Sequence, residues 1–327
     1  MAQKNQNQSF NVLNDTIDSY RIRQSVYYEP QGNEVVLVLT AYANNIPFVL
    51  KGPTGSGKST LVEHCVYLLG VGFNEFEAHY KKKLSKNKDP ISNKTVFEKI
   101  VDKCTAEQVQ FRTFGFPLIT INGHEDLDAD TLKGRHYLMD EEVVWLNGPA
   151  YLAAKQGAFL YFDEPAEARP DTLVVLHELT DHRQQLTIER LGLTQKVAPS
   201  FGFGMSYNDR YQDPRKEFKP STAQRFIHVP LAYPKEEDLE IKIVMTKTGL
   251  DQKTIRSLVS IARGTRTIAE KRELKEGAST REIIYAAQLI NDGISPKEAA
   301  LVTLCHPLTR QATTQNAIED LIKNHFK

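Results

Sequence analysis

The chain has 327 residues, which is long enough for one large domain or for two ordinary ones with a substantial core. Lysine plus arginine and aspartate plus glutamate both number 41, so the net charge is zero, which weighs against a dedicated DNA-binding protein. No apolar run reaches the roughly 18 residues of a membrane span, and the first residues lack the apolar core of a signal peptide. We therefore expect a cytoplasmic protein without a membrane span. The three cysteines are far apart, which indicates buried small residues rather than a disulfide framework or a zinc site.

The beginning of the chain is polar and rich in asparagine and glutamine, and we expect residues 1–25 to form a flexible N-terminal arm. The apolar stretch at 33–42 then predicts a helix, and the short apolar stretch at 46–50 predicts a buried strand.

The segment after this strand fits the pattern G-x-x-x-x-G-K-[ST] of a phosphate-binding loop. Its glycines allow backbone angles that other residues resist, so consecutive N–H groups can turn inward around phosphate oxygens. Lys58 can reach the β- and γ-phosphates of ATP, and the Ser59 hydroxyl can ligate Mg²⁺. The residues expected to bind this cofactor are Gly52, Pro53, Thr54, Gly55, Ser56, Gly57, Lys58, Ser59 and Thr60.

The surroundings of the loop support this interpretation. A helix is expected at 60–69, with its apolar residues on one face and Gly70 at its end. Strand, glycine-rich loop and helix are the context that the phosphate-binding pattern requires. Tyr27 and Tyr28, upstream of the strand, either flank an adenine ring or pack as ordinary core residues, and the sequence leaves both open.

Residues 72–116 differ from their surroundings, because they carry a local run of lysines at 81–88. Thr95 and Glu98 have the spacing of a capping box and predict a helix that extends to residue 106. We interpret the segment as an insertion on the surface of the molecule. Its lysines lie either on a solvated face or against an acidic partner.

A second strand is expected at 118–122, and His124 follows it within a group of carboxylates. The spacing of these residues matches no standard set of metal ligands. We therefore favour a helix cap at Asp128 over a metal site.

The apolar stretch at 158–162 ends in two carboxylates, Asp163 and Glu164. In a parallel sheet such a strand is buried, and its carboxyl end opens on the ligand crevice. Asp163 is expected to hold Mg²⁺, and Glu164 is expected to act as general base on the attacking water. A helix is expected next, at 172–179.

Three β elements are expected in the following part of the chain. The segment 185–197 alternates around Gly192 and predicts a hairpin. A strand at 201–208 ends in Asn208, which could orient the hydrolytic water from the neighbouring strand. The last apolar strand is expected at 226–231.

The chain is expected to be helical from residue 234 onward. Asp251 is a candidate cap for one helix, and Ser279 with Glu282 forms a capping box for another. Arg281 lies in the first turn of the latter helix, where a positive charge opposes the helix dipole and indicates another role.

These elements, in this order, resemble an AAA+ ATPase of the MoxR branch, and more closely the CbbQ/NorQ/NirQ family. The resemblance covers about residues 26 to 310 apart from 72–116, which is longer than the connection expected there. Its motifs are GNEV at 32–35, LKGPTG at 50–55, DL at 126–127 with LKGR at 132–135, NGP at 147–149, DE at 163–164 with EARPDT at 167–172, LTDHR at 179–183, SYN at 206–208, and KPST at 219–222 with QRF at 224–226.

The resemblance implies an α/β fold, namely a three-layer αβα P-loop NTPase core with a parallel sheet. This AAA+ core would span residues 26–234, including the insertion at 72–116, and a small C-terminal helical lid domain would span 235–327. The implied roles are Walker A for Lys58 and Ser59, Walker B for Asp163 and Glu164, sensor 1 for Asn208, sensor 2 for Arg281 and arginine finger for Arg225.

The resemblance also implies how such a protein acts. A finger from a neighbouring subunit needs head-to-tail contacts, which close into a ring, and family members act as hexamers. They work beside a partner with a von Willebrand factor A domain and remodel a metalloenzyme or a carboxylase, as in nitric oxide reductase maturation or Rubisco reactivation. We therefore expect a homo-oligomeric ATPase that uses ATP and Mg²⁺ and acts as a remodelling chaperone.

Other functions stay open at this stage. A gas-vesicle-type ATPase of the same branch shares the motifs. A nucleic-acid motor finds support only in the lysines of 72–116, and the neutral overall charge weighs against nucleic acid as a partner. A small-molecule kinase, active as a monomer, would also use the phosphate loop, but it leaves Arg225 and the hairpin without a role. A purely structural nucleotide-binding module would tolerate Glu164→Gln without loss.

Overall fold

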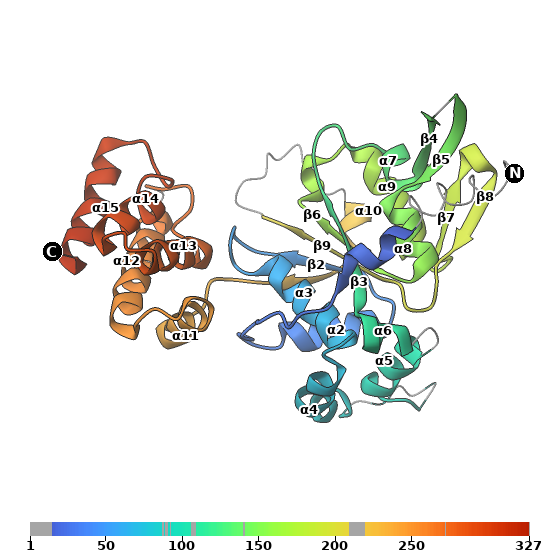
Figure 1. The fold of residues 1–327 in the computed structure, drawn as a ribbon, viewed down its shortest axis with the longest axis horizontal. Coiled ribbons are helices and arrows are strands. Elements are labelled where there is room, and N and C mark those ends of the chain that lie inside the picture. Colours follow the sequence, from blue (N-terminus) through green and yellow to red (C-terminus); the bar gives the residue numbers. More distant parts are fainter. Residues whose placement is uncertain are drawn as a thin grey trace, which may run out of the picture.

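A six-stranded sheet with the strand order β1-β3-β6-β9-β2-β10 lies at the centre of the larger part of the molecule (Figure 1). The computed structural model describes residues 15–86, 88, 91, 93–105, 109–139, 141–208, 220–271 and 273–326. Strands β3, β6, β9, β2 and β10 are parallel, and β1 at the edge is antiparallel to β3. The strands are β1 Arg21–Ile22, β2 Phe48–Lys51, β3 Phe116–Asn122, β6 Phe159–Asp163, β9 Gly202–Tyr207 and β10 Ile227–Pro230.

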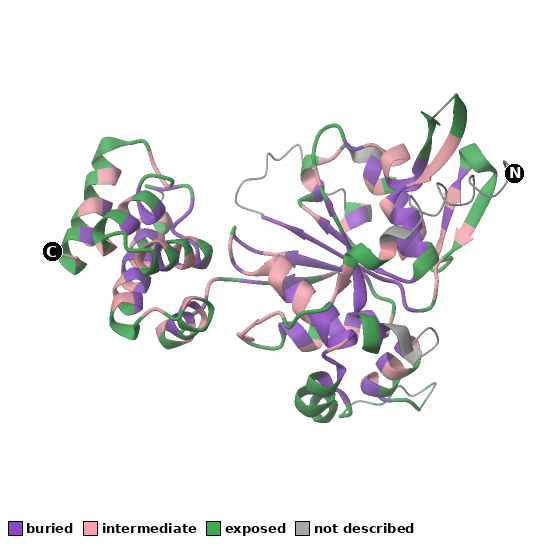
Figure 2. Ribbon diagram, viewed as in Figure 1, coloured by how far each residue is buried: buried purple, intermediate pink, exposed green. Residues whose placement is uncertain are grey.

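Helices cover both faces of this sheet, because the strands are apolar on both sides. In β2, Phe48 and Leu50 belong to one buried cluster, whereas Val49 belongs to the other. Figure 2 shows the strands buried between the two helical layers, as the expected three-layer αβα core requires. One layer contains α2 Glu34–Ala43, α3 Lys58–Leu69, α4 Phe73–Leu84, α5 Val96–Thr105 and α6 Val109–Phe114; the other contains α7 Ala129–Lys133, α8 Pro149–Gln156 and α9 Pro170–Thr180.

The segment 72–116 is more than an attachment to the surface. Its helices bury Phe76, Ile100 and Phe111 in the same cluster as α2 and α3, although the lysines at 81–83 are exposed as expected. The capping box is confirmed, since Thr95 N donates to Glu98 Oε2 and Glu98 N donates to Thr95 Oγ1. The apolar spacing along α4 is that of a helix with one buried face, so the segment extends the core.

Two hairpins and a short helix lie outside the central sheet. The hairpin expected around Gly192 is confirmed as β7 Gln185–Ile188 and β8 Leu193–Lys196. A second hairpin, β4 Gly134–Met139 with β5 Glu142–Asn147, was not expected from the sequence. Its strands are largely exposed on both sides, so they carry no alternation of apolar and polar residues. The helix α10 Pro220–Ala223 precedes β10.

The C-terminal part is helical, as expected, and has a buried cluster of its own. Asp251 caps its second helix by accepting a hydrogen bond from Thr254 N, and the reciprocal capping box of Ser279 and Glu282 is present. Figure 1 shows these helices as a separate bundle joined to the sheet through the segment after β10. The helices are α11 Glu237–Thr248, α12 Gln252–Glu270, α13 Thr280–Asn291, α14 Pro296–Leu304 and α15 Ala312–His325.

The remaining expectations concern single residues and the N-terminus. Asp128 is a helix cap, since its carboxylate accepts a hydrogen bond from Thr131 N. The three cysteines are buried and free. Residues 1–14 of the expected arm lie outside the described residues, whereas 21–22 pair with β3 and are attached to the sheet. Across the described ranges, none of the helices combines the length and the apolar character that crossing a membrane would need.

Candidate nucleotide-binding site

The phosphate-binding loop connects β2 to α3 at the carboxyl end of the parallel strands. Gly55 and Gly57 have φ values of 69° and 92°, in the left-handed region that favours glycine. A Cβ atom on Gly52 would lie 2.2 Å from the carbonyl oxygen of Leu231, directly after β10. The glycines are therefore needed both for the turn and for its close packing against the neighbouring strand.

Lys58 and Ser56 fit a bound phosphate. The Lys58 ammonium donates to the carbonyl oxygens of Gly52 (2.8 Å) and Pro53 (2.9 Å) and has no hydrogen bond to a carboxylate among the described residues. Burial lowers the pKa of Lys58, and the charges of Asp163 and Glu164 only partly offset this effect. Within the described part of the chain, Ser56 Oγ is the buried side-chain atom that lacks a hydrogen-bond partner.

Asp163 and Ser59 form a group of oxygen atoms suited to Mg²⁺. The Ser59 hydroxyl donates to Asp163 Oδ2 at 3.3 Å, and the Ser206 hydroxyl donates to Asp163 Oδ1. Tyr161 in turn donates to Ser206 Oγ at 2.7 Å. Hydroxyl and carboxylate oxygens are the ligands that this cation prefers, and a chain of neighbouring hydroxyls holds the carboxylate in place.

Glu164 follows β6 in an unusual backbone conformation. Its φ and ψ of 52° and 50° are in the left-handed region, which costs a residue other than glycine about 1–2 kcal/mol. The Glu164 N–H donates to the carbonyl oxygen of Ser206. A Cβ atom on Gly123 would lie 2.0 Å from the carbonyl oxygen of Glu164. The side chain is exposed, so the surrounding backbone holds a carboxylate at the open end of the strand.

Asn208 lies beyond the end of β9, the strand between β6 and β2. Its side-chain amide donates to Thr54 Oγ1 at 3.0 Å, so it contacts the phosphate-binding loop. The structure thus brings Lys58, Ser59, Asp163 and Asn208 together at one edge of the sheet.

The helical region contacts the same loop. A Cβ atom on Gly55 would lie 2.6 Å from Ser279 Cβ and 3.3 Å from Arg281 Cβ, so the start of α13 packs directly against it. A cavity of about 400 Å³ opens between the loop, α13 and the segment before α2. Tyr27 and Tyr28 are in its wall, and Tyr28 also packs against a core cluster. Core packing is therefore confirmed for Tyr28, and the flanking of an adenine ring stays a prediction.

Glu276 and Tyr233 contact the loop and were not expected from the sequence. Glu276 Oε1 accepts a hydrogen bond from Thr54 N at 3.0 Å, and the Tyr233 hydroxyl donates to Thr54 O at 2.9 Å. These residues are 222 and 179 positions away from Thr54 and match no motif, so only the folded chain reveals them.

Arg225 lies away from this site in its own chain. It precedes β10, which is parallel to β2 with Ile227 opposite Phe48, whereas the loop follows the other end of β2. The side chain is exposed beside α9, where burial of His177 lowers the pKa of this imidazole and the charge of Arg225 adds to that effect. The structure does not bring Arg225 to the other expected site residues.

Comparisons with known proteins agree with this geometry. Residues 240–325 match the sequence model of the CbbQ/NirQ/NorQ C-terminal region, and residues 103–226 match that of the AAA domain, dynein-related subfamily. The chain is 36% identical to protein CbbQ of Hydrogenophilus thermoluteolus over 95% of this chain and 99% of that protein. It is 36% identical to protein NorQ of Paracoccus denitrificans, with coverages of 90% and 92%, and 33% identical to the denitrification regulatory protein NirQ of Stutzerimonas stutzeri, with coverages of 92% and 92%. The chain therefore belongs to the CbbQ/NirQ/NorQ family of AAA-domain proteins.

Proposed function

We propose that this protein hydrolyses ATP and uses the reaction to remodel a target enzyme. The observation that carries the proposal is the meeting of the phosphate-binding loop, the acidic strand end and the helical region around Thr54, Asp163 and Ser279. Residues 26–234 would form the ATPase core and 235–327 the lid. A nucleotide bound between them would contact both parts.

The roles of the residues follow from their chemistry. Ser59 and Asp163 would hold Mg²⁺, which neutralises phosphate charge when it is bound. Glu164 would accept the proton of the attacking water, since its carboxylate is exposed at the open end of β6. Lys58 would exchange its two carbonyl acceptors for phosphate oxygens, and Asn208 would orient the water. Arg281 would neutralise phosphate charge from the lid.

The position of Arg225 supports a ring. Because it lies at the other end of the strands from its own phosphate loop, it can complete only the site of a neighbouring subunit. A contact between two different faces repeats head to tail and closes when the rotation allows, and we propose a hexamer.

The target belongs to the proposal as well. Relatives carry the names CbbQ, NorQ and denitrification regulatory protein NirQ. We propose a metalloenzyme such as nitric oxide reductase or a carboxylase such as Rubisco, reached through a partner with a von Willebrand factor A domain. To distinguish the candidates, the chain is purified together with each target enzyme in turn, and the activity of that enzyme is measured with and without ATP.

A complementation experiment tests the shared site. Lys58→Ala and Arg225→Ala are each expected to be inactive, and an arginine finger contributes about 10³–10⁵ in rate in related chemistry. Mixed at equal amounts, the two variants form rings in which about a quarter of the interfaces have an intact Lys58 on one side and an intact Arg225 on the other. Turnover should therefore reappear on mixing. The mixture must be shown to exchange subunits between rings. If it is then no more active than the separate variants, the proposal that two subunits share each site is refuted.

A further inference from the structure

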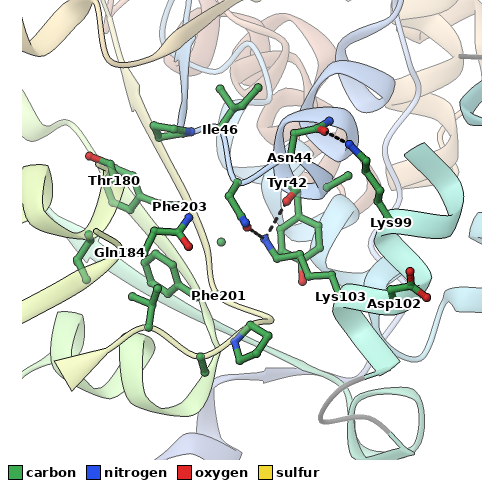
Figure 3. A pocket seen from close by; sticks show the side chains of 18 of the residues that line it. Tyr42, Asn44, Ile46, Lys99, Asp102, Lys103, Thr180, Gln184, Phe201 and Phe203 are labelled. Atoms are coloured by element: carbon green, nitrogen blue, oxygen red, sulfur yellow. Dashed lines mark hydrogen bonds between the residues drawn. The ribbon is translucent and has the colours of Figure 1, made fainter. Parts of the chain in front are cut away.

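A cavity of about 590 Å³ lies at the opposite end of the sheet from the phosphate-binding loop. Figure 3 shows the side chains that line it. Pro47, just before β2, and Gly202, at the start of β9, are in its lining, so it opens at the amino ends of these strands. Its other walls are the end of α2, helix α5 of the segment 72–116, and the turn between α9 and β7. The nucleotide chemistry described above uses none of these residues.

Lys103 brings a positive charge to this cavity. Its ammonium donates to Tyr42 O at 2.8 Å and to Asn45 Oδ1, and it lies 4.0 Å from the centre of the Tyr42 ring. All of these partners are neutral, and an ammonium has a third N–H to donate. Among the described residues no carboxylate forms an ion pair with Lys103, since the nearby Asp102 pairs with Lys94. Burial lowers the pKa of Lys103 to about 7.

Two strained residues lie in the same lining. Asn45 and Gln184 have φ values of 55° and 47°, which residues other than glycine rarely adopt. Such conformations persist where the surroundings enforce them, and they are frequent at ligand sites. Figure 3 shows the side-chain amide of Gln184 pointing into the cavity from the wall across from Lys103. Two polar groups that can donate hydrogen bonds thus face the same space.

Part of the lining is apolar and can pack against the body of a ligand, although Lys94, Lys99 and Asp102 also line the cavity. Ile46, Phe201 and Phe203 contribute their side chains to the cavity (Figure 3). Lys99, one turn before Lys103 on α5, already donates to Asn44 Oδ1 at 2.8 Å. The cavity therefore offers a hydrogen-bonding cation at one end and aliphatic and aromatic surface at the other, which is typical of small-molecule sites.

We propose that this cavity binds a small organic monocarboxylate. The carboxylate group accepts hydrogen bonds from Lys103 and Gln184, and the apolar body packs against Ile46, Phe201 and Phe203. Lys103, whose hydrogen-bond partners are neutral, supplies the ammonium that pairs with the carboxylate, and the arrival of this negative charge favours the charged form of Lys103. Because α5 and the sheet both contribute to the lining, the ligand holds the segment 72–116 against the ATPase core.

Titration of the full chain with sodium hexanoate tests this proposal, with hexanamide as the uncharged control. Hexanoate is expected to bind at least about tenfold more tightly than hexanamide, as the loss of a charged hydrogen bond predicts. Above pH 7, binding should take up a proton, seen as a dependence of the calorimetric heat on the ionisation enthalpy of the buffer. Lys103→Met should remove both the preference and the proton uptake, whereas Lys86→Met, an exposed lysine of the same segment, should keep them.

Three outcomes would overturn the proposal. The first is that no binding is detected at about 10 mM hexanoate, because a dissociation constant above this concentration is too weak for a carboxylate site. The second is equal binding of hexanoate and hexanamide. The third is unchanged binding in Lys103→Met. If that variant does not fold, Gln184→Leu replaces it, since it removes the opposite donor and should weaken the binding of hexanoate more than the binding of hexanamide, whose neutral carbonyl oxygen accepts a weaker hydrogen bond.

Discussion

The hydrogen bond between Glu276 and the phosphate-binding loop joins the C-terminal helical region to this loop. Glu276 is only 6% exposed, and its Oε1 accepts from Thr54 N at 3.0 Å and lies 3.3 Å from the Tyr233 hydroxyl. Glu276→Ala removes the carboxylate and leaves the Thr54 N–H without this hydrogen-bond acceptor. Hydrogen bonds to charged groups contribute about 1.5–3 kcal/mol, so the variant should bind ATP about 10- to 150-fold more weakly. Glu276→Gln keeps a neutral acceptor, and its loss should be smaller.

Equilibrium binding of ATP, measured together with thermal unfolding, distinguishes this contact from a general loss of stability. Glu270→Ala is the matched control, because this carboxylate is exposed at the end of α12. We expect the order wild type, Glu276→Gln, Glu276→Ala in ATP affinity, with the control equal to wild type. A Glu276→Ala protein that unfolds at a lower temperature but binds ATP as well as wild type would refute the reasoning, because the bond would then be structural only.

Four further predictions concern single residues. Glu164→Gln should bind ATP normally but lower its turnover by about 10²–10⁴-fold in a phosphate-release assay. Gly55→Ala should weaken ATP binding in the same titration, because it adds about 1–2 kcal/mol of strain at a φ of 69° and its Cβ would lie 2.6 Å from Ser279. Phe76→Ala should lower the free energy of unfolding in urea by about 3–5 kcal/mol, since this side chain is fully buried. Burial lowers the pKa of His64, so stability is lost as the pH falls from about 6.5 through the folded-state pKa, and His64→Gln should reduce that loss in urea titrations at pH 7 and pH 5.

Local chemistry explains which parts of the site could be predicted from the sequence. The phosphate loop needs glycines, a lysine and a serine within a few positions, and the acidic strand end needs carboxylates directly after an apolar run. Both signals are contiguous, so Lys58 and Asp163 could be expected to lie together as soon as their strands were assigned to one sheet. Asn208 followed from the same rule, since it comes directly after an apolar strand, and the structure places that strand between the other two.

The parts that could not be predicted depend on distant or weakly patterned residues. Glu276 and Tyr233 contact Thr54 only because the chain after β10 folds back on the loop, and nothing near them in sequence indicates that contact. In the segment 72–116, the run of lysines predicts a surface insertion, whereas the aromatic residues of α4 and α5 form a continuous buried stripe. The left-handed backbone of Glu164 depends on Gly123 and β9, which no local pattern around Glu164 includes.

The two cavities lie at opposite ends of the same strands, which makes their coupling measurable. Strand β2 has four residues, so about 13 Å separates its ends at roughly 3.3 Å per residue. If hexanoate changes the affinity for ATP by some factor, ATP must change the affinity for hexanoate by the same factor. Coupling between separate sites reaches a limit when the second ligand saturates, whereas competition for one site does not. An effect of hexanoate on ATP affinity that reaches a limit and disappears in Lys103→Met would therefore assign hexanoate to the cavity beside Lys103. An effect without a limit would place hexanoate in the cavity beside the phosphate-binding loop.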